Sequence, residues 1–106
     1  MTEALLRPDW ALPESVQSVV TTRFGGVSES PYGALNVALH VADQPARVAE
    51  NRRQVEVLAE LPAPPLWLQQ VHGTRVLMAN ASSAKEQQAD AAYTRDRHCV
   101  LAIMAA

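Results

Sequence analysis

The sequence has little of several residue types, and each shortage excludes a class of protein. A single cysteine, Cys99, excludes an internal disulfide framework, and a lone thiol is most often a small apolar residue of the core. Only four glycines among 106 residues, with 48% hydrophobic and 19% charged residues, exclude collagen-like and disordered chains. A chain of this length can build one hydrophobic core but hardly two. We therefore expect a small folded domain.

The charge balance excludes two kinds of partner. Nine basic and eleven acidic residues give a formal net charge of -2, which offers no positive surface to a nucleic-acid backbone or an anionic membrane. No apolar run approaches the length of a membrane span, and residues 1–7 lack the basic and apolar regions of a secretory leader. We expect no nucleic-acid partner, no membrane partner and a cytoplasmic protein.

The N-terminal half predicts extended segments followed by one helix. The β-branched run Val16–Arg23 predicts a strand that the following glycines end, and residues 28–33 predict a loop. In Leu35–Val41, apolar residues alternate with Asn36, Ala38 and His40, which would place the two groups on opposite faces if the segment is extended.

The helix has clear start and stop signals. Asp43 can accept amide hydrogens of a first turn, and Pro45 is tolerated there because its missing N–H costs nothing. We expect the helix to run to about Leu61, since Pro62 breaks it. One apolar stripe is predicted, opposite a charged, solvated side; the stripe consists of Val48, Val55, Leu58 and Ala59.

The C-terminal half predicts strands. Leu66–His72 and Arg75–Met78 flank Gly73-Thr74, a glycine-first pair that suits a tight hairpin. Residues 81–88 predict a surface loop, and residues 91–93 and 98–104 predict strands. The apolar run at residues 100–106 has no polar cap, so we expect the chain to stop within a core strand.

Two polar residues stand beside the predicted hairpin. His72 ends an apolar strand next to a glycine, where its imidazole could project into a pocket and bind zinc; a structural histidine is the alternative. Gln70 would share its face on a regular strand and could bind a ligand or orient the imidazole. An amide that satisfies nearby backbone is the alternative for Gln70.

A second candidate site lies after the first predicted strand. Arg23 precedes Gly25 and Gly26, whose amides could converge on an anion, so that this segment could hold a phosphate or a ribose. A mere tight turn is the alternative. Asn36 is also a candidate, although any buried amide needs a partner whether or not it binds a ligand. His98 and Cys99 are adjacent and would point to opposite faces of a strand, so they do not suggest a shared metal.

Common cofactor and nucleophile motifs are missing. There is no phosphate-binding loop of the Gly-x-x-x-x-Gly-Lys type, no Gly-x-Gly-x-x-Gly, no Gly-x-Ser-x-Gly and no cysteine pair. No residue is therefore assigned as catalytic.

Four segments together resemble, in order and spacing, the YfiH-type laccase-domain family: residues 21–28, 31–36, 48–52 and 70–74. The resemblance covers nearly the whole chain from the first strand onward, but only about the first half of a family domain. It implies an α+β fold with a mixed β-sheet and flanking helices, and it implies that residues 1–106 are the N-terminal part of a single domain. This part of the fold would be incomplete.

The resemblance also implies a function. The family was long described as multicopper polyphenol oxidase or laccase and is now associated with phosphorolysis of purine nucleosides and deamination of adenosine. Its partners would be purine nucleosides and phosphate, and its cofactor zinc, bound by a histidine matching His72 and by a later cysteine and histidine. Those later ligands would fall beyond Ala106, and Cys99 is not their match.

Three hypotheses follow from this. The first is a zinc-dependent purine nucleoside phosphorylase or deaminase that is inactive as this chain alone, unless a homo-oligomer completes the site. In it, Arg23 with Gly25 and Gly26 would orient phosphate, and Asn36 and Gln70 would contact substrate. The second is a non-catalytic module that binds a partner through an open sheet edge. The third, copper-dependent phenol oxidation, is weak because the chain lacks a His₂Cys set.

Overall fold

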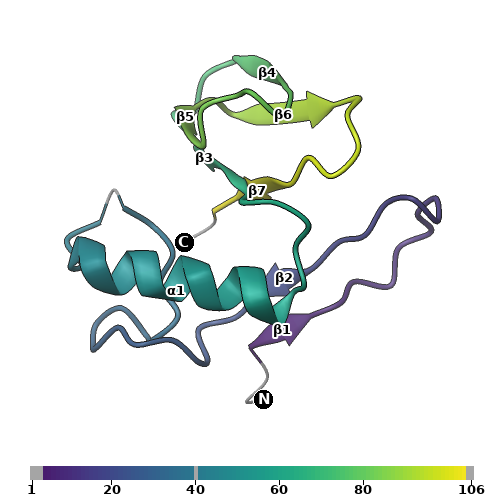
Figure 1. Cartoon of the computed structure of the whole chain (residues 1–106). Helices are drawn as coiled ribbons and strands as arrows, with labels where there is room; N and C mark the ends of the chain where they lie inside the picture. Colours follow the sequence, from purple (N-terminus) through teal and green to yellow (C-terminus); the bar gives the residue numbers. More distant parts are fainter. Residues whose placement is uncertain (1–3, 40, 105–106) are drawn as a thin grey trace. The chain divides into compact units, whose positions relative to one another are not determined.

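The computed structural model describes residues 4–39 and 41–104, which divide after Ala59 into two compact units. The first unit holds two short strands and the helix, and the second holds five strands (Figure 1). Parallel and antiparallel pairings both occur, together with a helix, so the predicted α+β class with mixed sheets is confirmed. That residues 1–106 belong to one larger domain stays a prediction.

In the first unit, strand β1 (Leu5–Leu6) pairs antiparallel with β2 (Val20–Thr21). The predicted strand Val16–Arg23 is therefore much shorter than its β-branched run. Its partner offers only two residues, Leu5 opposite Thr21 and Leu6 opposite Val20, so the ladder ends there. Backbone pairing, not local propensity, sets the length of this strand.

Residues 35–39 and Val41 do not form a strand, so the condition for two alternating faces is not met. Leu35 is buried, whereas Leu39 and Val41 are exposed. The cause lies in Asn36, whose Oδ1 accepts the amide of Ala38 at 3.1 Å, a local side-chain bond that turns the backbone away from an extended path. His40 lies outside the described residues.

Helix α1 (Pro45–Leu58) is close to its predicted bounds. Pro45 occupies its first turn as expected, but the N-cap is Gln44, and the backbone amide that Asp43 accepts is that of Gln44, before the helix begins. The helix ends at Leu58, before Pro62, and Glu60 takes a left-handed φ of 52° just beyond it. A left-handed residue after the cap ends this helix, and the proline is not needed.

The apolar stripe of the helix is confirmed at three of its four positions. Val48, Val55 and Ala59 are buried, while Leu58 is half exposed. Leu58 follows Val57 on the side that also carries Arg53 and Gln54, and those four residues line a shallow surface hollow of the first unit. The predicted stripe was one residue too wide.

The second unit contains two parallel sheets (Figure 1). In the first, β3 (Leu66–Gln69) lies between β5 (Glu86–Gln88) and β7 (Leu101–Ile103). In the second, β4 (Val76–Ala79) pairs with β6 (Ala91–Thr94). The core of the second unit contains Leu66, Leu68, Ala79 and Ala89. Cys99 packs against this core, as expected for a small apolar residue.

Two predictions for this unit are wrong. There is no hairpin at Gly73-Thr74, because β3 and β4 belong to different sheets, and the positive φ lies at His72 rather than at the glycine. Residues 86–88, expected in a loop, form the polar edge strand β5, which pairs with β3. The last strand is confirmed, over Leu101–Ile103 only. Among the described residues, no helix is long and apolar enough to cross a membrane.

Candidate functional site

The residue with the most unusual backbone near the end of β3 is His72. It lies three residues beyond the strand, is exposed, and has a φ of 58°. This left-handed conformation costs a residue with a Cβ roughly 1–2 kcal/mol, which glycine would avoid. An exposed imidazole therefore occupies a position that backbone energetics alone would assign to glycine. Because β3 ends at Gln69, the regular strand expected to carry both Gln70 and His72 is absent.

The turn that contains His72 is held by one carboxylate. Asp90 Oδ1 accepts the amides of Val71 at 3.0 Å and His72 at 2.7 Å, and its Oδ2 accepts the amide of Gly73 at 2.8 Å. Three successive N–H groups that converge on an anion form a backbone nest, which a left-handed residue makes possible. Here the anion is an internal side chain, so the nest fixes the backbone of the histidine.

The electrostatics of Asp90 follow from this nest. Partial burial of the carboxyl acts to raise its pKa, but the bonds from Gly73, Val71 and His72 and the nearby His72 imidazole outweigh it, so the pKa lies below its ordinary value. The carboxylate is therefore ionised wherever the protein is folded near neutral pH. A charged acceptor makes each of these hydrogen bonds stronger than a neutral one would.

The side chain of Gln70 also contacts this turn, through a bond to backbone. Its Nε2 donates to the carbonyl oxygen of Asp90 at 3.2 Å. Asp90 also donates its own amide to the carbonyl of Arg75 at 3.0 Å. In this structure Gln70 thus satisfies nearby backbone, and its predicted contact with substrate stays a prediction.

The second candidate site lies in the first unit, after β2. Gly25 and Gly26 have φ values of 92° and 77°, which explains why glycine is needed at both. The Gly26 amide donates to Gln54 Oε1 at 3.2 Å, so a protein group already uses one of the two amides expected to meet an anion. The Arg23 side chain is exposed and passes close to Gly33, where a Cβ would lie 3.2 Å from its Nε.

Asn36 belongs to a polar network that fastens this loop to helix α1. Its Nδ2 donates to Asp43 Oδ2 at 3.1 Å, and its carbonyl accepts from Asn51 Nδ2 at 2.8 Å. The fully buried Asn51 also accepts the amide of Val27 and donates to Ser28, each at 2.8 Å, and Ser28 donates to Asp43. The amide of Asn36 is thus occupied by structural partners; a contact with substrate stays a prediction.

The candidates fall into two groups. Arg23, Gly25, Gly26 and Asn36 lie in the first unit, and Gln70 and His72 lie in the second with Asp90. Within residues 4–39 and 41–104, no group of three histidine, cysteine, aspartate or glutamate side chains could hold a metal ion. The described residues alone therefore do not complete a zinc site around His72. His98 is also exposed with a φ of 59°, beyond the end of β6.

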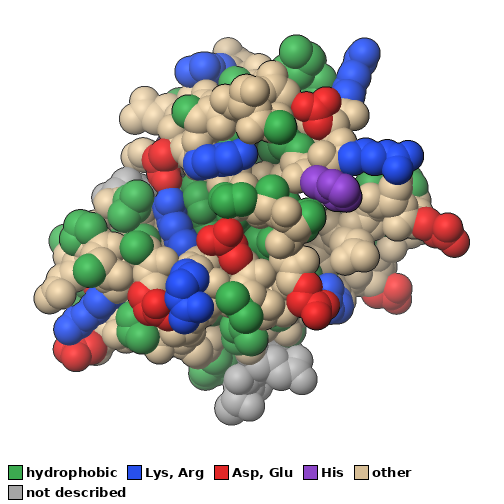
Figure 2. Space-filling model, in the orientation of Figure 1, with side chains coloured by type: hydrophobic (Ala, Val, Ile, Leu, Met, Phe, Trp, Pro, Cys, Tyr) green, Lys and Arg blue, Asp and Glu red, His purple; other side chains and the backbone are tan. Residues whose placement is uncertain are grey.

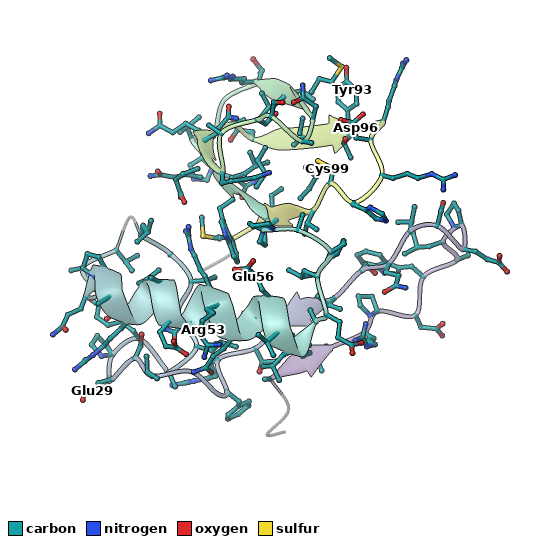
Figure 3. All side chains as sticks on the ribbon, in the orientation of Figure 1. Glu29, Arg53, Glu56, Tyr93, Asp96 and Cys99 are labelled. Carbon is teal, nitrogen blue, oxygen red and sulfur yellow. The ribbon has the colours of Figure 1, made fainter. Side chains whose placement is uncertain are left out.

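The visible face of the molecule carries no concentration of charge of one sign. On the face visible in Figure 2, basic and acidic side chains are interspersed among apolar ones. Figure 3 shows Tyr93 on β6 and Asp96 just beyond it, with Cys99 further along the same connection. Basic and acidic residues also alternate here, at Arg95, Asp96 and Arg97. No concentrated basic patch for a nucleic acid is visible on this face.

Sequence analysis missed Asp90. The sequence does contain a signal: Asp90 is a charged residue between two small apolar residues, Ala89 and Ala91. The sequence does not reveal the partner of Asp90. His72 lies 18 residues earlier, and the Asp90 side chain reaches its turn directly, without a pair of strands between them.

The chain is similar to known proteins in sequence and in structure. The family model described as "Multi-copper polyphenol oxidoreductase laccase" matches residues 17–106. "Purine nucleoside phosphorylase YfiH" of Shigella flexneri is 41% identical over 102 residues, which are 96% of this chain and 42% of that relative. "Purine nucleoside phosphorylase PA4543" of Pseudomonas aeruginosa is 45% identical over 91 residues, 86% of this chain and 36% of that protein.

Solved structures agree. YlmD from Geobacillus stearothermophilus superposes with a TM-score of 0.86 and 26% identity, over 97% of this chain and 42% of that one. Protein NMB0706 of Neisseria meningitidis gives a TM-score of 0.64 with 40% identity, over 71% of this chain and 30% of that one. The chain therefore spans less than half the length of the relatives that it matches.

Proposed function

Because the chain belongs to the family described as multi-copper polyphenol oxidoreductase laccase, and relatives of this family are named purine nucleoside phosphorylases, we propose that it forms part of a purine nucleoside phosphorylase. Its substrates would be purine nucleosides and inorganic phosphate, in the cytoplasm. We also propose that the same site deaminates adenosine.

One observation carries the proposal on the structural side. His72 keeps an exposed imidazole on a left-handed backbone that a carboxylate fixes, although glycine would relieve the strain. Strain retained at an exposed polar residue is typical of binding and catalytic positions. His98 is also exposed with a left-handed backbone, so the carboxylate that fixes the turn is what distinguishes His72.

We propose that this imidazole is one zinc ligand. Neutral imidazole is a common donor to zinc, and structural and catalytic zinc sites in proteins use at least three protein ligands. The described residues supply His72 and no completed set, so the remaining donors must come from elsewhere. This chain alone should then bind zinc weakly and show little or no turnover. Copper fits less well, because a blue-copper site needs two histidines and a cysteine as ligands.

We assign phosphate to the loop that follows β2. Arg23 is exposed and its guanidinium passes close to Gly33, and Gly25, two residues after Arg23 in the sequence, lies at a turn with positive φ. Arginine binds phosphate through paired hydrogen bonds, and a turn amide can add a further donor. Titration with inorganic phosphate should shift the amide signal of Gly25 in nuclear magnetic resonance spectra, and Arg23→Ala should abolish the shift. Arg53→Ala, which removes an exposed arginine of α1, should leave it unchanged.

The experiment that tests the zinc proposal compares two histidines. The purified chain is titrated with Zn²⁺ while the imidazole signals of His72 and His98 are followed. His98 is the matched control, since both residues are exposed with φ near 60°. Zinc should shift and broaden His72 selectively, and His72→Ala should remove the binding. Equal response of both imidazoles would indicate adventitious binding and would contradict the proposal.

Turnover is measured alongside, as phosphate-dependent release of free base from adenosine and inosine. We expect background rates for the chain alone. Turnover above background that His72→Ala abolishes and His98→Ala keeps would support the phosphorylase and would show that copies of the chain complete the site together. Absence of phosphate and zinc binding at these residues would favour a non-catalytic binding module.

A further inference from the structure

The backbone nest at residues 71–73 is filled by the side chain of a residue that is itself firmly anchored. Ala89, the neighbour of Asp90, is completely buried in the core of the second unit. The amide of Asp90 donates to Arg75 at the start of the β4 segment, and strand β6 begins immediately after it. Asp90 is thus tied to the core on both sides, whereas residues 71–73 lie past the end of β3 and are exposed.

We propose that Asp90 is the positioning residue of His72, holding the left-handed turn so that the imidazole keeps one direction. This inference rests on the proposed role of His72. The strand cannot serve this purpose, because its ladder ends at Gln69, and no other described side chain accepts the three amides. The imidazole therefore takes its position from a carboxylate in a distant segment.

The two carboxylate oxygens of Asp90 accept different numbers of hydrogen bonds from the turn. Oδ1 accepts two amides, those of Val71 and His72, and Oδ2 accepts the amide of Gly73. In Asp90→Asn, one oxygen becomes an NH₂ group that faces an amide donor, so at least one of these bonds must be lost whichever way the amide is oriented. The variant is nearly identical in shape, which keeps the packing around Ala89 unchanged.

Hydrogen exchange of the full chain provides the first test. In the wild type, the amides of residues 71–73 should be protected although the residues are exposed. Asp90→Ala should accelerate their exchange by about tenfold or more, as expected for loss of charge-assisted hydrogen bonds. The amides of Leu66 and Trp67, which bond to Val100 and Lys85, report the intact sheet and should keep their protection.

Asp90→Asn keeps the test decisive if the alanine variant unfolds. It should accelerate exchange either at Gly73 or at Val71 and His72, with the sheet unchanged. Asp96→Asn is the matched control, since Asp96 is an exposed aspartate beyond β6 in the same unit. The inference would be overturned if all three amides exchange at the wild-type rate in both Asp90→Asn and Asp90→Ala. It would also be overturned if none of these amides is protected in the wild type.

The second readout separates a positioning role from a merely structural one. With Zn²⁺ as the probe, Asp90→Asn should weaken binding at the His72 imidazole by roughly tenfold, a typical effect of losing a group that orients a ligand. Binding in Asp96→Asn should equal that of the wild type. Loss of protection at residues 71–73 with unchanged zinc affinity would overturn the positioning role. No zinc response at His72 in the wild type would instead contradict the proposed function, while hydrogen exchange alone still decides whether Asp90 holds the turn.

Discussion

The fully buried side chain of Asn51 donates to the hydroxyl of Ser28 at 2.8 Å and so joins helix α1 to the loop that follows Gly25 and Gly26. The same side chain satisfies the amide of Val27 and the carbonyl of Asn36. One amide thus completes three hydrogen bonds that no regular ladder provides. The shape of this loop, and with it the position of Arg23, depends on Asn51.

Replacement of Asn51 by alanine should therefore destabilise the first unit. Three partners would lose their bond inside a buried site, and we expect unfolding to become easier by about 2–4 kcal/mol. Urea unfolding followed by circular dichroism of the helix measures this. Arg53→Ala, on the exposed side of the same helix, should change stability by no more than about 0.5 kcal/mol. Equal effects of the two variants would contradict the role given to Asn51.

Gly26→Ala should disrupt the same loop far more than Gly25→Ala. Both glycines have positive φ, so either substitution strains the backbone by roughly 1 kcal/mol. At Gly26 a Cβ would also lie 2.5 Å from the carbonyl oxygen of Ala34 and 2.6 Å from Asn51 Oδ1. At Gly25 its nearest neighbour would be at 3.6 Å. We expect a difference of about 1–3 kcal/mol between the variants in urea unfolding, and similar values would show that the loop yields to the Cβ.

Acid should weaken the first unit partly through Asp43. The hydrogen bond from Ser28 lowers the pKa of this carboxyl, partial burial opposes it, and Asn36 lowers it further, with a net decrease. A carboxyl whose pKa is lower in the folded state stabilises the fold above its unfolded pKa, about 3.9. That stabilisation is lost as the pH falls through the folded-state pKa.

Asp43→Asn tests this assignment. The difference in unfolding free energy between wild type and variant should be constant above about pH 5 and should shrink below about pH 4. Asp9→Asn, at an exposed aspartate, serves as the control and should show no such trend. A difference that stays constant down to the lowest pH would mean that another group carries the acid response.

Leu68→Ala should destabilise the second unit. Leu68 is almost completely buried in the centre of β3, and its removal should cost about 2–5 kcal/mol. Fluorescence of the buried Trp67, in a Trp10→Phe background, measures the unfolding of this unit. Val76→Ala, at an exposed position on β4, should cost less than about 0.5 kcal/mol. A small loss at Leu68 would indicate that the core is not formed in solution.

Sequence reasoning predicted the parts of this structure that local signals determine. Helix α1 was predicted because Pro45 and an apolar stripe act within a few residues, and the identity of His72 as a candidate came from its place beside a glycine. The predicted hairpin was wrong because strand pairing depends on distant residues: β3 pairs with β5 and β7 rather than with its neighbour β4. Asp90 escaped prediction for the same reason.

Polarity misled the prediction of strand β5. Glu86, Gln87 and Gln88 have no apolar alternation, and an edge strand needs none, since its backbone pairs on one side and its side chains reach water. At residues 35–39 the prediction was wrong in the opposite sense, because an extended segment was expected and a loop is found. There, a regular apolar alternation was overridden by Asn36, whose side chain bonds to the backbone two residues ahead.

The parallel order of β5, β3 and β7 has a consequence for synthesis on the ribosome. Leu66 pairs with Leu101, so the central strand obtains its second neighbour only after the polypeptide has been translated past residue 103. Until then, the apolar run Leu66–Leu68 has an open flank in the nascent chain, and long-range parallel pairing is slow to form. Helix α1 needs no such delay, because its bonds are local. A pause in translation between residues 69 and 101 would therefore leave the apolar strand β3 without this neighbour, and chaperone binding is expected to concentrate there.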